Sequence, residues 1–229
     1  MTICLELSEN TKHDLIHAMS SMNLSSKNTC AIVKIQSIVR MYLKYKFMLI
    51  PSALYQTKIW RQQRSWYATG KSNECEIYQI RMIEQIIHQK WVKTQDRIHM
   101  RKLLISPKKY PMRYDDGFEY TETFDGIQYA NNKTIYYNLK FVCGAGGAQT
   151  RTLREVYHFI ESQLKLLLES DDPNIYFVNI LDGNESYKAM SKFNYLLTNK
   201  QYTKIKKNIF IGDLASFQIY YSSFSSLSI

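Results

Sequence analysis

The chain has 229 residues, of which 45% are hydrophobic, so it is long enough to bury the core of one large domain. No run of eighteen apolar residues occurs, and the N-terminus has acids but no basic segment ahead of an apolar stretch. We therefore expect a soluble, intracellular protein without a membrane span or a signal peptide. The four cysteines form no CxxC pair, which argues against a structural zinc site and against a disulfide scaffold.

The formal net charge of +10 is concentrated in the first half of the chain. Of the 30 Lys and Arg residues, 18 lie within residues 1–110, together with 7 of the 20 Asp and Glu residues. A basic surface of this kind suits a polyanionic partner, most commonly a nucleic acid. The alternative is a solvated basic helix that has no partner.

Two helices are predicted near the N-terminus, because apolar residues recur there at helical spacing. In the second of them, Ile32, Ile35 and Val39 fall on one face. We therefore divide the chain into a basic helical extension, residues 1–65, and a core, residues 66–229.

The helix predicted over residues 32–48 is basic and amphipathic. Its Ile35, Gln36 and Arg40 resemble an IQ motif, the type of helix that calmodulin-like proteins bind, although Tyr45 stands where a second basic residue is expected. A calmodulin-like partner is one interpretation. Contact with the DNA backbone, or packing against the core, is the other.

The segment after Pro51 interleaves cations with aromatic residues. Arg61 and Arg64 alternate here with Trp66 and Tyr67, a combination that suits phosphate contact and base stacking. A basic loop that is packed by its own aromatic residues is the alternative.

A long amphipathic helix is predicted from Glu74 onwards. Ile77, Ile80 and Ile83 recur at helical intervals, and the pattern predicts a break only before Ser106-Pro107.

The second half of the chain changes period. Aromatic and β-branched residues alternate on both sides of Asn131-Asn132-Lys133, which predicts a β-hairpin with a short turn. A helix follows, with Val156 and Phe159 among its inward residues, and then a continuously apolar strand that ends at Asp182-Gly183. A second helix and a last strand followed by a turn complete the order. The order β-β-α-β-α-β indicates an α/β (α+β) fold with a mixed sheet flanked by helices.

Three polar residues are predicted to meet on the hairpin. Asp125 opens its first strand, whereas Asn138 and Lys140 share one face of the second strand because side chains alternate with period two. A carboxylate that holds Mg²⁺, beside a lysine that orients or deprotonates water and offsets phosphorane charge, is suited to phosphodiester hydrolysis. Alternatively, Asp125 is a turn residue and Lys140 protects a strand edge.

The order of these segments resembles the PD-(D/E)XK nuclease superfamily, in particular the type II restriction endonucleases. The resemblance rests on Asp125, the hairpin, Asn138 and Lys140, a glycine-rich turn and the residues that open the next helix, and it covers residues 66–217. It implies a restriction-endonuclease-like fold and a homodimer that cleaves double-stranded DNA at specific sequences, with Mg²⁺ or Mn²⁺ as cofactor. Asp125, Asn138 and the Leu139 carbonyl would hold the metal, and Lys140 would lie near the attacking water.

The resemblance also extends upstream and downstream of the hairpin. The segment that begins GKSNEC resembles a G-K-x-x-E element and assigns Glu76 to the metal site, with Glu74 and Glu84 behind it. Gln149 and Arg151, at the start of the next helix, would contact phosphate; as purely structural residues they would cap that helix.

One position departs from the family pattern. The residue two before the lysine is usually Glu or Asp, whereas here it is Asn138, a neutral ligand that binds Mg²⁺ less well. A second carboxylate would then have to come from Glu76 or Glu122. The alternative function is therefore a catalytically impaired relative that binds DNA.

Overall fold

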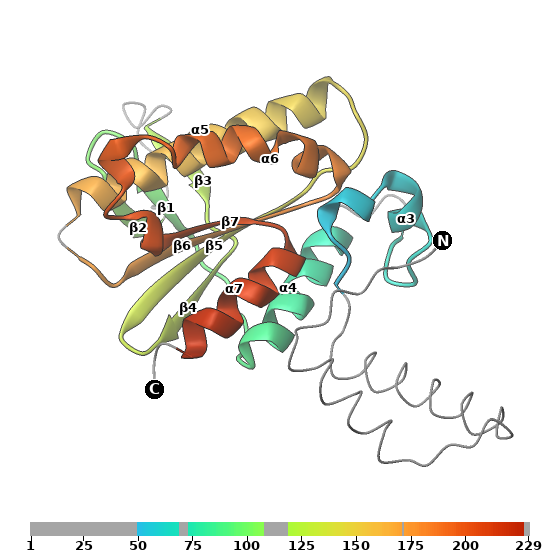
Figure 1. Cartoon of the computed structure of the whole chain (residues 1–229), viewed down its shortest axis with the longest axis horizontal. Helices are drawn as coiled ribbons and strands as arrows, with labels where there is room; N and C mark the ends of the chain where they lie inside the picture. Colours follow the sequence, from blue (N-terminus) through green and yellow to red (C-terminus); the bar gives the residue numbers. More distant parts are fainter. Residues whose placement is uncertain (1–49, 69–72, 108–118, 171, 227–229) are drawn as a thin grey trace, which may run out of the picture. The chain divides into compact units, whose positions relative to one another are not determined.

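The computed structural model describes residues 50–68, 73–107, 119–170 and 172–226 (Figure 1). The two helices predicted near the N-terminus, including the IQ-like helix, lie outside the described residues. The chain divides between Leu49 and Ile50, so residues 50–65, which we assigned to the extension, belong to the second unit together with the core. The architecture below is that of the second unit.

A four-stranded mixed sheet forms the centre of this unit. Its strand order is β4-β5-β6-β7, with β4 antiparallel to β5 and the last three strands parallel to one another. The predicted mixed sheet flanked by helices is therefore confirmed at the level of class. The strands are β4 (Gly126–Ala130), β5 (Lys133–Phe141), β6 (Ile175–Asp182) and β7 (Ile209–Gly212).

Helices cover both faces of this sheet (Figure 1). On one face lie α5, which joins β5 to β6, and α6, which follows β6; on the other lie α4 and α7, which contact each other. Short helical turns complete the unit. The helices are η1 (Ala53–Tyr55), α3 (Lys58–Gln62), α4 (Glu74–Ile87), α5 (Gly147–Glu169), α6 (Asn184–Leu196), η3 (Lys200–Tyr202), η4 (Lys206–Asn208) and α7 (Leu214–Ser226).

The side chains of β5 alternate between two hydrophobic clusters. Tyr136 packs with the residues of α5 and α6, whereas Ile135, Tyr137 and Leu139 pack with those of α4 and α7. Burial on both faces explains why β6 is almost continuously apolar. The inward residues predicted for α5, such as Val156, are buried or packed against the first cluster.

The hairpin predicted around Asn131 is confirmed. Asn131 and Asn132 form the turn with φ of 50° and 60°, and Ala130 pairs with Lys133 on either side. Two successive residues with positive φ match the twist of a two-residue hairpin turn, and asparagine tolerates that conformation better than most residues.

The long helix predicted from Glu74 to the residue before Ser106 is wrong beyond Ile87. There α4 ends, and His88 takes a left-handed conformation with φ of 52°. The apolar residues after Ile87 no longer recur every three or four positions, and antiparallel pairing instead buries Ile98 completely. A second, three-stranded sheet results, in the order β2-β1-β3, from β1 (Asp96–His99), β2 (Leu104–Pro107) and β3 (Tyr120–Thr123).

The C-terminal segment also differs from the prediction of a simple turn after β7, because it forms α7. Asp213 caps this helix: its Oδ1 accepts hydrogen bonds from the Ser216 N–H at 2.8 Å and hydroxyl at 2.5 Å. Its Oδ2 accepts from the Ala53 N–H at 2.8 Å and the Ser52 hydroxyl at 3.0 Å, which ties the start of the unit to its end. Burial raises the pKa of Asp213, but these hydrogen bonds lower it by more, so the net pKa lies below its ordinary value.

Asp213→Ala should lower the free energy of unfolding by about 1–3 kcal/mol at pH 7, because four hydrogen bonds to a buried carboxylate are lost. Since the folded pKa is lowered, this contribution is present above the unfolded pKa of about 4 and disappears as the pH falls below it. Urea unfolding at pH 7 and pH 3 measures both effects. Glu169→Ala, at an exposed acid, is the control, and equal stability of Asp213→Ala and the unsubstituted protein at pH 7 would contradict the capping role.

Candidate functional site

A cavity of about 400 Å³ lies where β5 ends and α5 begins, with α4 along its side. In sheets with parallel strands, the carboxyl ends of the strands are the usual place for ligands. The residues that line the cavity are Arg61, Cys75, Glu76, Gln79, Asp125, Leu139, Lys140, Phe141, Val142, Cys143, Ala148, Gln149 and Thr152.

Most of the predicted site residues meet in this cavity. Asp125 and Lys140 come from the two strands of the hairpin, Glu76 comes from α4 and Gln149 from the first turns of α5. Arg61 reaches the cavity from α3. Residues separated by up to 91 positions in the sequence, Arg61 and Thr152, therefore line one space.

Two predicted DNA-binding residues lie elsewhere. The Arg64 guanidinium lies 4.7 Å from the centroid of the Trp60 ring, and its Nε donates to the Trp60 carbonyl oxygen. The side chain of Arg151 is 75% exposed and lies 3.9 Å from Glu155. Neither residue lines the cavity, so for these two the phosphate-contact role stays a prediction.

Asp125 is held in place by the backbone of β5. Its N–H donates to the Tyr137 carbonyl oxygen at 2.9 Å, and its Oδ2 accepts from the Leu139 N–H at 2.6 Å. The glycine that follows is required by packing, since a Cβ atom at Gly126 would lie 2.1 Å from the Trp91 ring. The carboxylate is thus fixed in orientation before any ligand binds.

Burial raises the pKa of Asp125 to about 6. The Lys140 ammonium and the Leu139 N–H oppose this shift, whereas the negative charges of Glu76 and Glu122 add to it. A raised pKa means that the positive charge and hydrogen bonds around the ionised carboxylate do not fully replace the hydration that it loses on burial. A further cation in the cavity would supply the missing compensation.

Lys140 forms an ion pair with Glu122, whose Oε2 lies 2.5 Å from Nζ. Burial lowers the pKa of Lys140, but Glu122, Asp125 and Glu76 raise it by more, and the net pKa lies above its ordinary value. Lys140 is therefore protonated at neutral pH. Its chemistry is that of a fixed positive charge and hydrogen-bond donor, which favours orienting water and stabilising anionic charge over accepting a proton.

Gln79 is a site residue that the sequence reasoning missed. Its Nε2 donates to the Lys140 carbonyl oxygen at 3.1 Å and to Asp182 Oδ2 at 2.8 Å, which fixes α4 against the ends of β5 and β6. Glu76 lies three residues earlier, on the same face of α4. The sequence did contain a signal for Gln79, because Glu76 and Gln79 are polar residues three positions apart in a helix whose buried side consists of isoleucines.

Asp182, to which Gln79 donates, is completely buried at the end of β6. Burial raises its pKa to about 7, against the hydrogen bonds from the Gln79 side chain and the Leu214 N–H. Asp182 does not line the cavity. The residue that we predicted to end a strand at a turn therefore also anchors two helices.

Asn138 lies across from the hairpin residue Asp125 but does not line the cavity. Its Nδ2 donates to Asn179 Oδ1 at 3.0 Å, and Asn179 in turn exchanges hydrogen bonds with Gln163 of α5 at 2.7 and 3.1 Å. This buried amide chain links β5, β6 and α5. Within the described part of the chain, Asn138 Oδ1 is buried without a hydrogen-bond partner, so its predicted role as a ligand stays a prediction.

The carboxylates of the cavity suit one kind of metal ion. Among the described residues, no group of three or more His, Cys, Asp and Glu side chains is placed to hold an ion. A closed zinc site does not fit such a donor set. Mg²⁺ fits better, because it binds through one or two carboxylates and completes its octahedron with water and substrate phosphate. Asp125 and Glu76 are the carboxylates that line the cavity.

Comparisons with protein-family models, with curated proteins and with solved structures find no match. The assignment of function therefore depends on the chemistry of the cavity. Across the part of the chain that the structure describes, no helix is both long and apolar enough to cross a membrane.

Divalent metal binding should depend on Asp125 and on pH. Loss of a group that supports a metal costs about 10–100-fold in affinity, and we expect at least that for Mn²⁺ on Asp125→Asn. Because protons compete for a carboxylate whose pKa is about 6, the affinity should fall as the pH drops from 7 to 5. Electron paramagnetic resonance of free Mn²⁺ in a titration measures both.

The matched control for this titration is Asp172→Asn, at an exposed acid that does not line the cavity. Its Mn²⁺ affinity should equal that of the unsubstituted protein. Binding that is equally strong in Asp125→Asn would remove the metal site from this cavity.

Proposed function

We propose that the protein is a metal-dependent DNA endonuclease of the PD-(D/E)XK type, which hydrolyses phosphodiester bonds in double-stranded DNA. The observation that carries the proposal is the meeting of Asp125, Lys140 and Glu76 in one cavity at the carboxyl end of β5. A fixed carboxylate, a protonated lysine and a second carboxylate are the groups that such hydrolysis requires. The mixed sheet between helices is compatible with the fold that the sequence resemblance implies.

The cavity residues divide the work of hydrolysis between them. Mg²⁺ or Mn²⁺, when bound, would polarise the scissile phosphate and supply an activated water. Asp125 would hold the ion with its Oδ1, since Oδ2 is engaged by the Leu139 N–H, and Glu76 would approach from α4. Lys140 would orient the attacking water and stabilise the negative charge that develops on phosphorus.

Two further residues would position the DNA. Gln149 and Arg61 line the cavity from α5 and α3 respectively, and each carries hydrogen-bond donors for phosphate oxygens. The net charge of +10 favours association with a polyanion. A homodimer, in which two such sites act on both strands of a palindrome, and sequence-specific cleavage remain parts of the proposal that follow from the resemblance alone.

Cleavage of DNA should require Asp125 and Lys140. We expect Asp125→Asn to abolish cleavage, and Lys140→Ala to lower its rate at least about 100-fold, because removal of one preorganised charge-stabilising donor typically costs that much. The measurement is a gel assay on long, unmethylated double-stranded DNA with Mg²⁺, Mn²⁺ or EDTA. Lys102→Ala, an exposed lysine between β1 and β2, is the control for loss of positive charge.

In this assay the unsubstituted protein should give metal-dependent bands, and the two cavity variants should give intact DNA while their unfolding midpoints show that they still fold. Normal cleavage by either cavity variant would contradict the proposed site.

The second function, a DNA-binding relative that does not cleave, is favoured by Asn138 at the position where the family usually has an acid. The buried amide chain to Asn179 gives that residue a structural purpose instead. The second function predicts intact DNA in every lane together with a metal-independent gel shift.

The variant Asn138→Asp separates the two functions. It replaces an N–H donor by an oxygen that faces Asn179 Oδ1, so we expect it to destabilise the fold and not to increase cleavage by an active enzyme. Thermal unfolding and the cleavage assay measure these effects. Cleavage that begins only in Asn138→Asp would instead assign the unsubstituted chain to the impaired class.

A further inference from the structure

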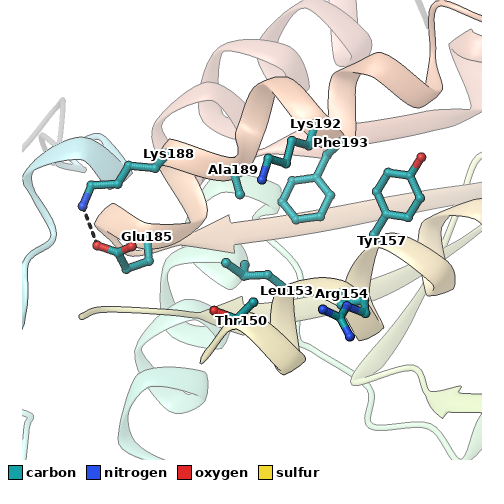
Figure 2. A pocket seen from close by; sticks show the side chains of 9 residues that line it. All are labelled: Thr150, Leu153, Arg154, Tyr157, Glu185, Lys188, Ala189, Lys192 and Phe193. Carbon is teal, nitrogen blue, oxygen red and sulfur yellow. Dashed lines mark hydrogen bonds and ion pairs between the residues drawn. The ribbon is translucent and has the colours of Figure 1, made fainter. Parts of the chain in front are cut away.

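A second cavity of about 400 Å³ lies between α5 and α6, and it shares no lining residue with the candidate active site. Figure 2 shows its side chains facing each other from the two helices, with Arg154 and Tyr157 on α5 opposite Lys188 and Lys192 on α6. Leu153 and Phe193 form its floor of apolar surface. This cavity is the first part of what we call the α5–α6 groove.

Two neighbouring cavities extend the groove along the same helices. The first, of about 400 Å³, includes Tyr157, Lys192 and Tyr195. The second, of about 510 Å³, again includes Tyr157 and Tyr195 and continues to Gln201 in η3. All three cavities include Tyr157, and each further shared residue, Lys192 or Tyr195, joins two of them, so they form one elongated depression.

The groove carries an excess of positive charge. Its acids are already paired: Glu185 lies 2.6 Å from Lys188, and Glu161 lies 3.1 Å from Lys165. Within the described ranges, Arg154 and Lys192 form no ion pair. The segment from residue 184 to residue 212, which supplies α6 and the turns after it, contains six lysines and one acid, Glu185. The sequence analysis placed the positive charge in residues 1–110 and did not identify this local excess in the second half of the chain.

Aromatic side chains line the same depression. Tyr195 is 69% exposed, although a tyrosine gains free energy when its ring is buried, and Tyr157 is only partly buried. Exposed rings between cations are the equipment of single-strand binding surfaces, in which bases stack on the rings and phosphates lie against Lys and Arg. A duplex keeps its base faces stacked inside and would use the cations alone.

We propose that the α5–α6 groove binds single-stranded DNA, with bases on Tyr157 and Tyr195 and phosphates along Arg154 and Lys192. The choice of DNA over RNA rests on the proposed function, whereas the groove itself requires no catalysis. The first turns of α5 contribute to both cavities, since Gln149 and Thr152 line the candidate active site and Thr150 and Leu153 line the groove. The groove is thus placed to hold a strand that continues past the site of cleavage.

The test measures fluorescence anisotropy of a labelled oligothymidylate of about 15 nucleotides with the full chain in EDTA, so that no DNA is cleaved. The double variant Lys192→Ala/Tyr195→Ala should bind about tenfold more weakly, because one stacking contact and one phosphate contact are lost. Both side chains are exposed, so the fold should be preserved, and an unchanged unfolding midpoint verifies this. Arg81→Ala, at an exposed position on α4, removes one positive charge outside the groove and should leave binding within about twofold.

Two comparisons make the result specific. The first compares Tyr195→Phe, which retains the ring, with Tyr195→Ala, which removes it. Stacking predicts that Tyr195→Phe binds as the unsubstituted protein does and that Tyr195→Ala binds more weakly, whereas a purely electrostatic surface predicts equal affinity for the two. A duplex of the same length should lose little affinity in the double variant. Equal single-strand affinity of the double variant and the unsubstituted protein, or a preference for duplex DNA or for RNA, would overturn the proposal. Asp125→Asn should bind the oligonucleotide normally, so failure of the groove and failure of the nuclease proposal are separate outcomes.

Discussion

The register of the β4–β5 hairpin is the constraint on which the candidate site depends. Pairing of Gly126 with Tyr137 places Asp125 beside the backbone of Leu139, whose N–H holds the carboxylate at 2.6 Å. The same register directs Lys140 into the cavity next to it. Because strand side chains alternate, a slip of one residue would turn Lys140 to the opposite face of the sheet. The Asn131-Asn132 turn, which admits only a two-residue connection, therefore controls the chemistry at the far end of the hairpin.

An electrostatic imbalance follows from that arrangement. Three carboxylates, those of Asp125, Glu76 and Glu122, influence one another around a single lysine, and Lys140 is engaged by Glu122. Burial is the main cause of the raised pKa of Asp125, about 6, and the negative charges of Glu76 and Glu122 add to it. A raised pKa alone does not mark a functional site, because the pKa of Asp182, a structural carboxylate outside the cavity, is raised to about 7. A shifted pKa combined with a cavity and a charge partner is typical of a functional site.

The sequence predicted those elements whose structure depends on residues that are close together in the chain. The hairpin followed from its turn residues and alternation, and α5 followed from the helical spacing of residues such as Val156 and Phe159. The convergence of Asp125 and Lys140 could be predicted too, because it needs only a hairpin and the period of a strand.

The remaining features depend on pairings between distant segments. Spacing along the chain does not encode the ion pair of Lys140 with Glu122 in the second sheet, or the hydrogen bond of Asn138 to Asn179, 41 residues away. That second sheet was itself missed, because the isoleucine pattern of α4 was extended past Ile87 into residues that pair as strands. Asn138 is the clearest case: its residue type suggested a weakened ligand, whereas its contacts make it a link between strands and helix.

The most direct test of the central claim, that Asp125 is the carboxylate of a divalent metal site, is a crystal structure of the protein soaked with Mn²⁺ and measured at an X-ray energy that gives manganese an anomalous signal. We predict an anomalous peak in the cavity at about 2.0–2.6 Å from Asp125 Oδ1, on the side that faces Glu76. A structure at saturating Mn²⁺ with no peak in this cavity, and with Asp125 engaged only by the Leu139 N–H and Lys140, would contradict it.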